Sequence, residues 1–116
     1  MEELELSEKQ ITKAITDELQ WRMNLKQLLW IKNNRFAGKF LRKDGSQGFI
    51  KNTGRGSPDL IIVLPNTVLW VEVKTKKGFL SEFQKMWQEK LANLGQLYYI
   101  VRSHNDFTKI LKKFNL

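Results

Sequence analysis

Asp59, Glu72 and Lys74 are the residues of this chain whose types and spacing are best suited to chemistry. In an extended strand successive side chains point to opposite faces, so Glu72 and Lys74 project together while the valines beside them point the other way. A lysine and a glutamate on a half-buried strand cost free energy unless they are paired or bind a ligand. The pattern therefore favours a site at which these charges meet a ligand.

The residues between the two carboxylates predict a hairpin that brings them together. Asp59 begins the apolar run 60–64, and the turn signal 65–67 then leads into a second strand, 68–74. Two carboxylates that lie close together repel each other, and a hard divalent cation such as Mg²⁺ or Mn²⁺, which prefers oxygen ligands, removes that repulsion. Lys74 could then stabilise charge on a phosphate or help to activate water.

This order of residues resembles the signature of the PD-(D/E)XK nuclease superfamily, Pro58-Asp59 followed by Glu72-x-Lys74. Further segments narrow the likeness to the virus-type replication-repair nuclease (VRR-NUC) domain, which is similar in order and spacing over most of the chain. These segments are Gly56-Ser57-Pro58-Asp59-Leu60-Ile61, Val71-Glu72-Val73-Lys74, Gly78-x-Leu80-Ser81-x-x-Gln84 and Leu94-Gly95. The resemblance implies an α/β fold with a restriction-endonuclease-like core, in which helices flank a mixed central β-sheet of the αβββαβ type.

The resemblance also implies the composition of the site. One metal ion or a pair of them would be held by carboxylates and a backbone carbonyl, and an acidic residue on the first helix, best matched by Glu8, would join them. The implied catalytic residues are Asp59, Glu72, Lys74, Gln84 and Glu8, and the implied metal ligands are Asp59, Glu72, the carbonyl of Val73, and Glu8.

Each implied residue has a purely structural alternative. Asp59 can belong to a turn, since aspartate after proline is a common turn residue. Gln84 stands three residues after Ser81, so it can be the reciprocal partner of a capping box. Glu8 lies in the first turn of its helix, where the helix dipole stabilises any carboxylate. Glu8 and Glu18 both fall on the apolar stripe of that helix, so Glu18 is the alternative acidic residue, and helical spacing does not choose between them.

Periodicity predicts the elements that position these residues. Ser7 opens a capping box and a helix that runs to about residue 25, and short strands or a hairpin are expected within 28–51. Ser81 can cap a second helix that ends at Gly95, followed by a strand at 97–101 and a last helix at 107–114. The expected apolar stripes are Ile11, Ile15 and Leu19 on the first helix and Phe83, Trp87, Leu91 and Leu94 on the second.

Composition narrows the class of protein. The 116 residues, 41% of them hydrophobic, can bury one core, so residues 1–116 are expected to form a single domain. The net charge of +8 favours a polyanionic partner such as DNA, with Arg55, Lys76 and Lys77 as candidate phosphate contacts, although charged loops are often only solvated. There is no cysteine and no apolar stretch long enough to span a bilayer, so we expect an oxygen-bound metal and a cytoplasmic protein without a membrane partner.

These observations together predict a metal-dependent DNA endonuclease. The resemblance further implies homodimers that act on branched DNA such as Holliday junctions, and the aromatic residues Trp30, Phe36 and Phe40 give modest support for a dimer interface. The alternative function is a nucleic-acid-binding module of the same fold that does not cleave, or a subunit that is active only within a larger complex.

Overall fold

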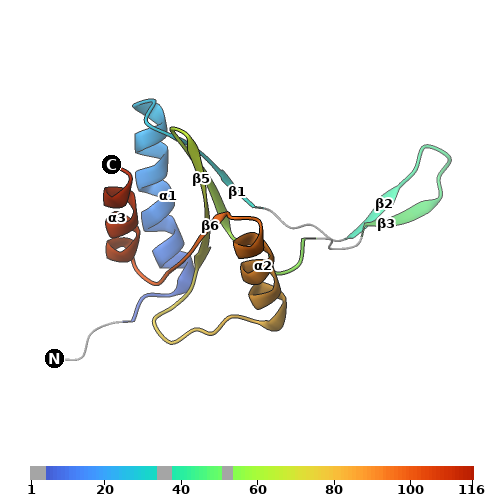
Figure 1. The fold of residues 1–116 in the computed structure, drawn as a ribbon. Coiled ribbons are helices and arrows are strands. Elements are labelled where there is room, and N and C mark those ends of the chain that lie inside the picture. The colour runs from blue at the N-terminus through green and yellow to red at the C-terminus, as the bar shows by residue number, and fades with distance from the viewer. Residues whose placement is uncertain (1–4, 34–37, 51–53) are drawn as a thin grey trace.

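The protein is described by a computed structural model that covers residues 5–33, 38–50 and 54–116. Figure 1 shows the arrangement of its helices and strands. In chain order they are α1 (Glu8–Asn24), β1 (Leu29–Lys32), β2 (Gly38–Leu41), β3 (Gln47–Ile50), β4 (Leu60–Leu64), β5 (Thr67–Val73), α2 (Glu82–Asn93), β6 (Leu97–Val101) and α3 (His104–Lys113).

The centre of the protein is a mixed four-stranded sheet with the strand order β1-β4-β5-β6. β1 and β5 pair antiparallel with β4, whereas β5 and β6 pair parallel because α2 connects them. Helices α1 and α3 lie on one face of the sheet and α2 lies on the other (Figure 1). The expected α/β fold, a mixed central sheet flanked by helices, is confirmed.

The core lies between the sheet and the pair of helices α1 and α3. β4 alternates between buried and partly exposed positions, and the register places its buried Leu60 opposite Val71 of β5, so both strands present apolar side chains to the same face. The predicted stripe of α1 is also buried, because Ile11, Ile15 and Leu19 are each no more than 2% exposed. The apolar side chains on one face of each strand and helix therefore form this core.

The helix boundaries follow the predicted caps. Ser7 and Ser81 both form complete capping boxes, and Gly95 ends α2 with a φ of +72°. The predicted stripe of α2 is only partly correct: Leu91 is buried but Leu94 is 74% exposed, because it follows the last helical turn and lies outside the packed face. Within the described ranges no helix combines the length and the apolar character needed to cross a membrane.

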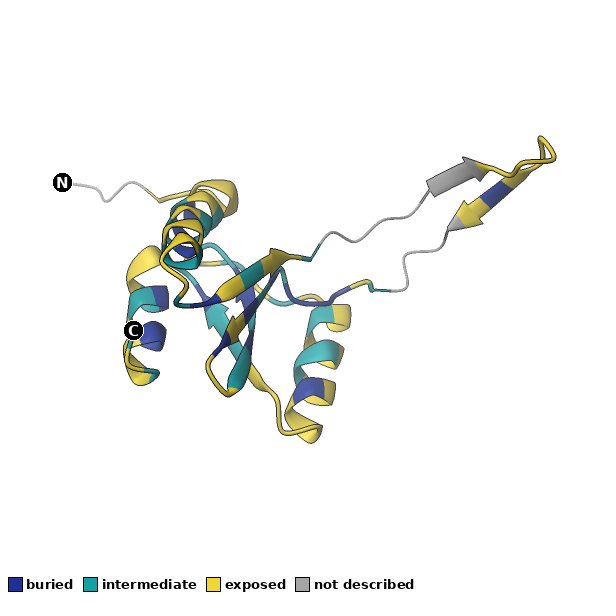
Figure 2. Ribbon diagram, turned by 90° about the horizontal axis from the view of Figure 1, so that it is seen from above, coloured by how far each residue is buried: buried dark blue, intermediate teal, exposed yellow. Residues whose placement is uncertain are grey.

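The predicted hairpin within 28–51 is present as β2 and β3, which pair antiparallel from Gly38↔Ile50 to Leu41↔Gln47. Among the described elements the two strands contact only each other, and most of the described hairpin residues are exposed (Figure 2). The turn is fixed by Asp44, whose carboxylate accepts hydrogen bonds from the backbone and the hydroxyl of Ser46, and by Gly45 at φ +86°. Of the aromatic residues expected at a dimer interface, Phe36 and the side chain of Phe40 lie outside the described part of the chain.

Candidate active site

Asp59 and Glu72 lie next to each other on adjoining strands. Asp59 directly precedes β4, and the pairing of Leu60 with Val71 places it opposite Glu72 when the register is extended by one residue. The Oδ2 atom of Asp59 accepts a hydrogen bond from the backbone N–H of Val73 at 2.8 Å. The β4–β5 hairpin therefore brings the two predicted carboxylates together, and it places the backbone of Val73 beside them.

Glu72 is a buried carboxylate, only 1% exposed, on the face of the sheet that α2 covers. Its Oε1 atom accepts a hydrogen bond from Nε2 of Gln84 at 3.0 Å. The other end of the same amide completes the capping box, because Oε1 of Gln84 accepts the backbone N–H of Ser81 at 2.8 Å. Gln84 therefore completes the helix cap and also contacts Glu72.

Lys74 follows the end of β5 and is half-buried. Its backbone N–H donates to the carbonyl of Val101 at 3.0 Å, which continues the β5–β6 pairing and keeps Lys74 on the same face as Glu72. The next loop passes close by, since a Cβ atom on Gly78 would lie 3.6 Å from Cδ of Lys74. Nη1 of Arg102 fixes that loop by donating to the carbonyls of Thr75 at 2.7 Å and Gly78 at 2.8 Å.

The segment before Asp59 is held rigidly, although its two glycines would suggest a flexible loop. Gly56 has a φ of +86°, and a Cβ atom there would lie 2.4 Å from the carbonyl carbon of Phe83, so only glycine lets this loop pack on the start of α2. Asn33 holds the same segment from the other side. Its backbone N–H donates to the carbonyl of Asp59 at 2.8 Å, and its Nδ2 donates to the hydroxyl of Ser57 at 2.6 Å.

Asn33 and Arg102 are the residues that sequence reasoning missed. In the sequence Asn33 belongs to a turn signal and Arg102 is one of many basic residues, so neither has a pattern that distinguishes it. Their role is visible only in three dimensions, where each one bonds to backbone groups of a loop that flanks the two carboxylates.

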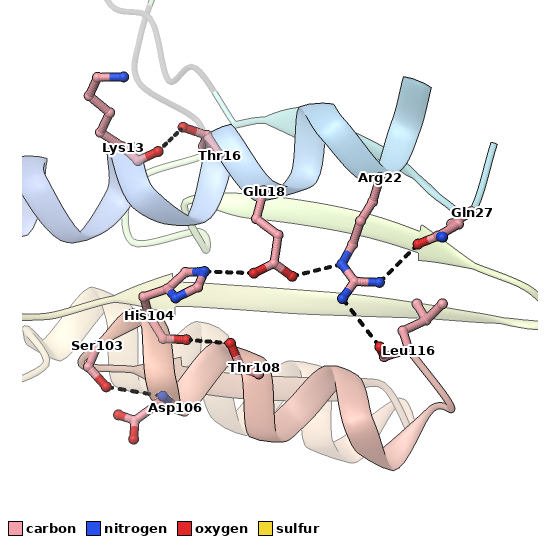
Figure 3. A network of polar contacts seen from close by, with 10 residues as sticks. All are labelled: Lys13, Thr16, Glu18, Arg22, Gln27, Ser103, His104, Asp106, Thr108 and Leu116. Atoms are coloured by element: carbon pink, nitrogen blue, oxygen red, sulfur yellow. Dashed lines mark hydrogen bonds and ion pairs between the residues drawn. The ribbon is translucent and has the colours of Figure 1, made fainter. Parts of the chain in front are cut away.

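Glu8 and Glu18 occupy different environments on α1. Glu8 is exposed, contrary to the expectation that it lies on the buried stripe, because the core begins one turn later at Ile11; it lines a cleft that also reaches Asp59. Glu18 binds Nε of Arg22 at 2.7 Å and Nε2 of His104 at 2.6 Å (Figure 3). Glu18 thus joins α1 to α3, and of the two acids only Glu8 lines the cleft that reaches Asp59.

The three candidate phosphate contacts lie at the protein surface. The guanidinium of Arg55 stacks over the ring of Phe83 at 4.2 Å from its centroid, and Lys77 forms an exposed ion pair with Glu5 at 3.6 Å. Lys76 is exposed as well. The charged groups of Arg55 and Lys77 thus have neighbours within the protein.

Tyr98 of β6 adds a phenol to the face of the sheet that carries Glu72. It pairs with Trp70, two residues before Glu72 on β5, and its hydroxyl is buried without a hydrogen-bond partner in the described part of the protein. Burial, together with the nearby charges of Glu72 and Asp59, raises the pKa of the Tyr98 phenol well above its ordinary value. The hydroxyl is therefore held protonated beside the two carboxylates.

The donor set at this site suits a hard cation. Asp59 and Glu72 provide carboxylate oxygens, Val73 a backbone carbonyl, and no sulfur ligand exists because the chain has no cysteine. Burying the carboxylate of Glu72 is costly unless hydrogen bonds and a positive charge compensate for it. Within the described ranges no three acidic or histidine side chains gather into a metal-binding group, so Glu8 is separated from the pair in this structure.

Comparison with known proteins identifies the family. The fold and the paired carboxylates define a nuclease-like α/β domain, and residues 6–105 match the VRR-NUC domain family. The chain belongs to this family of nucleases. A solved structure described as a VRR_NUC domain is similar to the chain with a TM-score of 0.61 and 19% sequence identity, covering 92% of this chain and 97% of that one. No curated protein sequence matches the chain.

Proposed function

We propose that this protein is a metal-dependent endonuclease that hydrolyses phosphodiester bonds in DNA. The observation that carries the proposal is the placement of Asp59 and Glu72 on adjoining strands, with Gln84 bonded to Glu72 at 3.0 Å and Lys74 on the same face. Family membership supports nucleic acid as the substrate, and the net charge of +8 favours a polyanion.

In this proposal Mg²⁺ or Mn²⁺ is held by Asp59, Glu72 and the carbonyl of Val73, with Glu8 contributing from α1. A bound divalent cation supplies Lewis-acid polarisation of a phosphate and lowers the pKa of a water. The ammonium group of Lys74 neutralises the negative charge that develops on the phosphate, and Gln84 orients Glu72 through its hydrogen bond. Arg55, Lys76 and Lys77 contact flanking phosphates from the surface around the site.

The proposed substrate is branched DNA such as a Holliday junction, which the homodimer implied by the family resemblance would engage with two active sites. To test the function, labelled four-way-junction, flap and linear duplex DNA are incubated with the protein in Mg²⁺, Mn²⁺ or EDTA. We expect cleavage only with metal, fastest on the junction, and a loss on the order of 100-fold or more in Lys74→Ala. Lys90→Ala, which removes an exposed lysine from α2, is the matched control and should cut normally.

Binding of DNA without cleavage in either metal would contradict the nuclease function and favour the alternative, a nucleic-acid-binding module that does not cleave. Equal cleavage of all three DNAs would leave the nuclease in place but remove the selectivity for branches. Cleavage by Lys74→Ala at the wild-type rate would show that the reacting phosphate lies elsewhere.

A strip of the sheet supports the proposed homodimer. Leu29, Ile31 and Val63 are 61%, 60% and 42% exposed, and the register places them on the sheet face opposite α1. The described part of α2 contacts β6 and leaves this strip on β1 and β4 uncovered. Trp30, by contrast, packs against the core on the other face, so it does not belong to this surface.

The oligomeric state provides the test. We expect the mass measured by light scattering to be that of two chains for the wild type and of one chain for Ile31→Asp. Leu94→Asp, at another exposed apolar residue just after the end of α2, should remain a dimer. A wild-type mass of one chain at working concentration would contradict the homodimer.

A further inference from the structure

A cleft of about 670 Å³ opens beside Asp59, on the side of the site away from α2. It lies between α1 and the edge strand β1, which contact each other along the core face of the sheet. Its walls include Glu8, Lys9, Thr12 and Lys13 from α1 and Trp30 and Lys32 from β1, and Asp59 lines it as well. The cleft therefore leads from the surface to a predicted catalytic carboxylate.

The cleft carries positive charge that is available to a ligand. Lys9 and Lys32 form no ion pair with any residue in the described part of the chain, and both side chains are exposed. Lys13 is paired with Asp17 at 2.9 Å, but both groups are largely exposed, so solvent screens the pair and the lysine remains available to an anion. The two walls thus present lysines to the space between them.

The shape and the charge of the cleft together select the class of ligand. A small anion would need convergent donors in a closed pocket, whereas an open cleft with lysines on opposite walls suits a chain of anions. The half-buried indole of Trp30 adds an apolar surface between the lysines, against which a sugar or a base can lie. The phosphodiester backbone of DNA has this combination of repeating charge and intervening apolar surface.

We infer that the α1–β1 cleft binds the backbone of the DNA strand next to the scissile phosphate, with Lys9 and Lys32 as its phosphate contacts. The inference rests on the proposed nuclease function and gives the substrate a path across the molecule. In this arrangement the strand reaches Asp59 between α1 and β1, past the start of α1, where Lys77 pairs with Glu5.

The test compares two double variants with the same change in net charge. Lys9→Ala/Lys32→Ala removes the proposed contacts, and Lys109→Ala/Lys112→Ala removes two exposed lysines from α3. Binding of a labelled four-way junction is measured in EDTA, without cleavage, between roughly 50 and 200 mM salt. We expect the slope of the logarithm of the association constant against the logarithm of the salt concentration to become shallower by about 1.8 in the first variant. This corresponds to about 0.9 for each phosphate that is no longer neutralised. The slope should stay unchanged in the second variant.

Equal slopes for the two double variants, or no measurable binding by the wild type, would overturn the inference. Thermal unfolding of each variant confirms that the fold is retained, which is expected because all four lysines are exposed. Cleavage by the wild type in Mg²⁺ is measured separately. Cleavage together with equal slopes would contradict only the proposal that the cleft binds DNA. The expected slopes without cleavage would contradict the nuclease function and retain the cleft as a DNA-binding site.

Discussion

Gln84 makes two kinds of contact because its side-chain amide has two chemically different ends. The acceptor end completes the capping box with Ser81, and the donor end bonds to the buried carboxylate of Glu72. The first turn of α2 is thereby attached to β5, so the position of the helix and the orientation of the carboxylate depend on one residue. Sequence spacing alone detects the cap, since Glu72 is distant in the chain.

Variants of the two capping residues separate these roles. Ser81→Ala removes the cap and should lower the free energy of unfolding by roughly 0.5–2 kcal/mol, with little effect on cleavage. Gln84→Ala should lower stability by a similar amount and should also slow cleavage, because Glu72 loses its hydrogen bond. Denaturant unfolding and cleavage rates measure the two effects. Equal cleavage rates for both variants would limit Gln84 to capping.

Tyr98 should make the free energy of unfolding decrease at alkaline pH. Its pKa is raised above the ordinary value of 10.0, chiefly by burial, so the folded state holds the phenol proton more tightly than the unfolded chain does. The resulting stabilisation is fully present below about pH 10 and is lost as the pH rises toward the raised pKa. Above about pH 10 the wild type should lose more stability with rising pH than Tyr98→Phe, as measured by denaturant unfolding. Parallel stability curves for the two proteins would contradict this prediction.

At the scale of elements, the loop before β4 is shaped by close packing on α2. Gly56→Ala places a methyl group against the backbone of Phe83, whereas Gly95→Ala, at a similar positive φ of +72°, meets nothing within 4 Å. Both variants should be destabilised by their backbone conformation, and Gly56→Ala should lose about 1–3 kcal/mol more through overpacking. Urea unfolding compares them. An equal loss in both variants would mean that the loop can move away from α2 at no cost.

Two acidic residues of α1 have different expected roles, Glu8 at the site and Glu18 in the contact between α1 and α3. Glu18→Gln weakens the contacts to Arg22 and His104 and should cost roughly 1–3 kcal/mol of stability with cleavage retained. Glu8→Gln should change stability by less than about 0.5 kcal/mol, because Glu8 is exposed, yet it should slow cleavage. Thermal unfolding and cleavage assays of both variants check this division. The reverse pattern would return Glu18 to the site.

Sequence patterns predict those parts of the elements that depend on local chemistry. Ser7 and Ser81 are hydroxyl residues followed three residues later by glutamine, so both helix starts could be placed. The apolar run from Leu60 to Leu64 before a turn signal indicated a strand. Leu94 was assigned wrongly because helical spacing continues past the point where neighbouring elements stop covering the helix. Asn33 could not be predicted, since its partners in the 57–59 segment follow from the tertiary fold.

At the scale of the whole molecule, the two faces of the central sheet carry different kinds of residue. The face covered by α1 and α3 carries the apolar core, and the other face carries Glu72 beneath α2. The hairpin of β2 and β3 contacts no other described element, so it adds nothing to the core and extends the surface instead. The buried carboxylate of Glu72 therefore lies at one end of the central strand pair β4–β5, where it adjoins Asp59.

The central claim is that this pair of carboxylates supports metal-dependent cleavage of DNA. The most direct measurement is the rate of phosphodiester cleavage as a function of Mg²⁺ concentration, for the wild type and for the isosteric variant Glu72→Gln. We predict a saturable rise for the wild type, no cleavage in EDTA, and a loss on the order of 100- to 1,000-fold in Glu72→Gln, which should fold at least as stably because it buries no charge. Cleavage by the wild type in EDTA, or by Glu72→Gln at the wild-type rate, would contradict the claim.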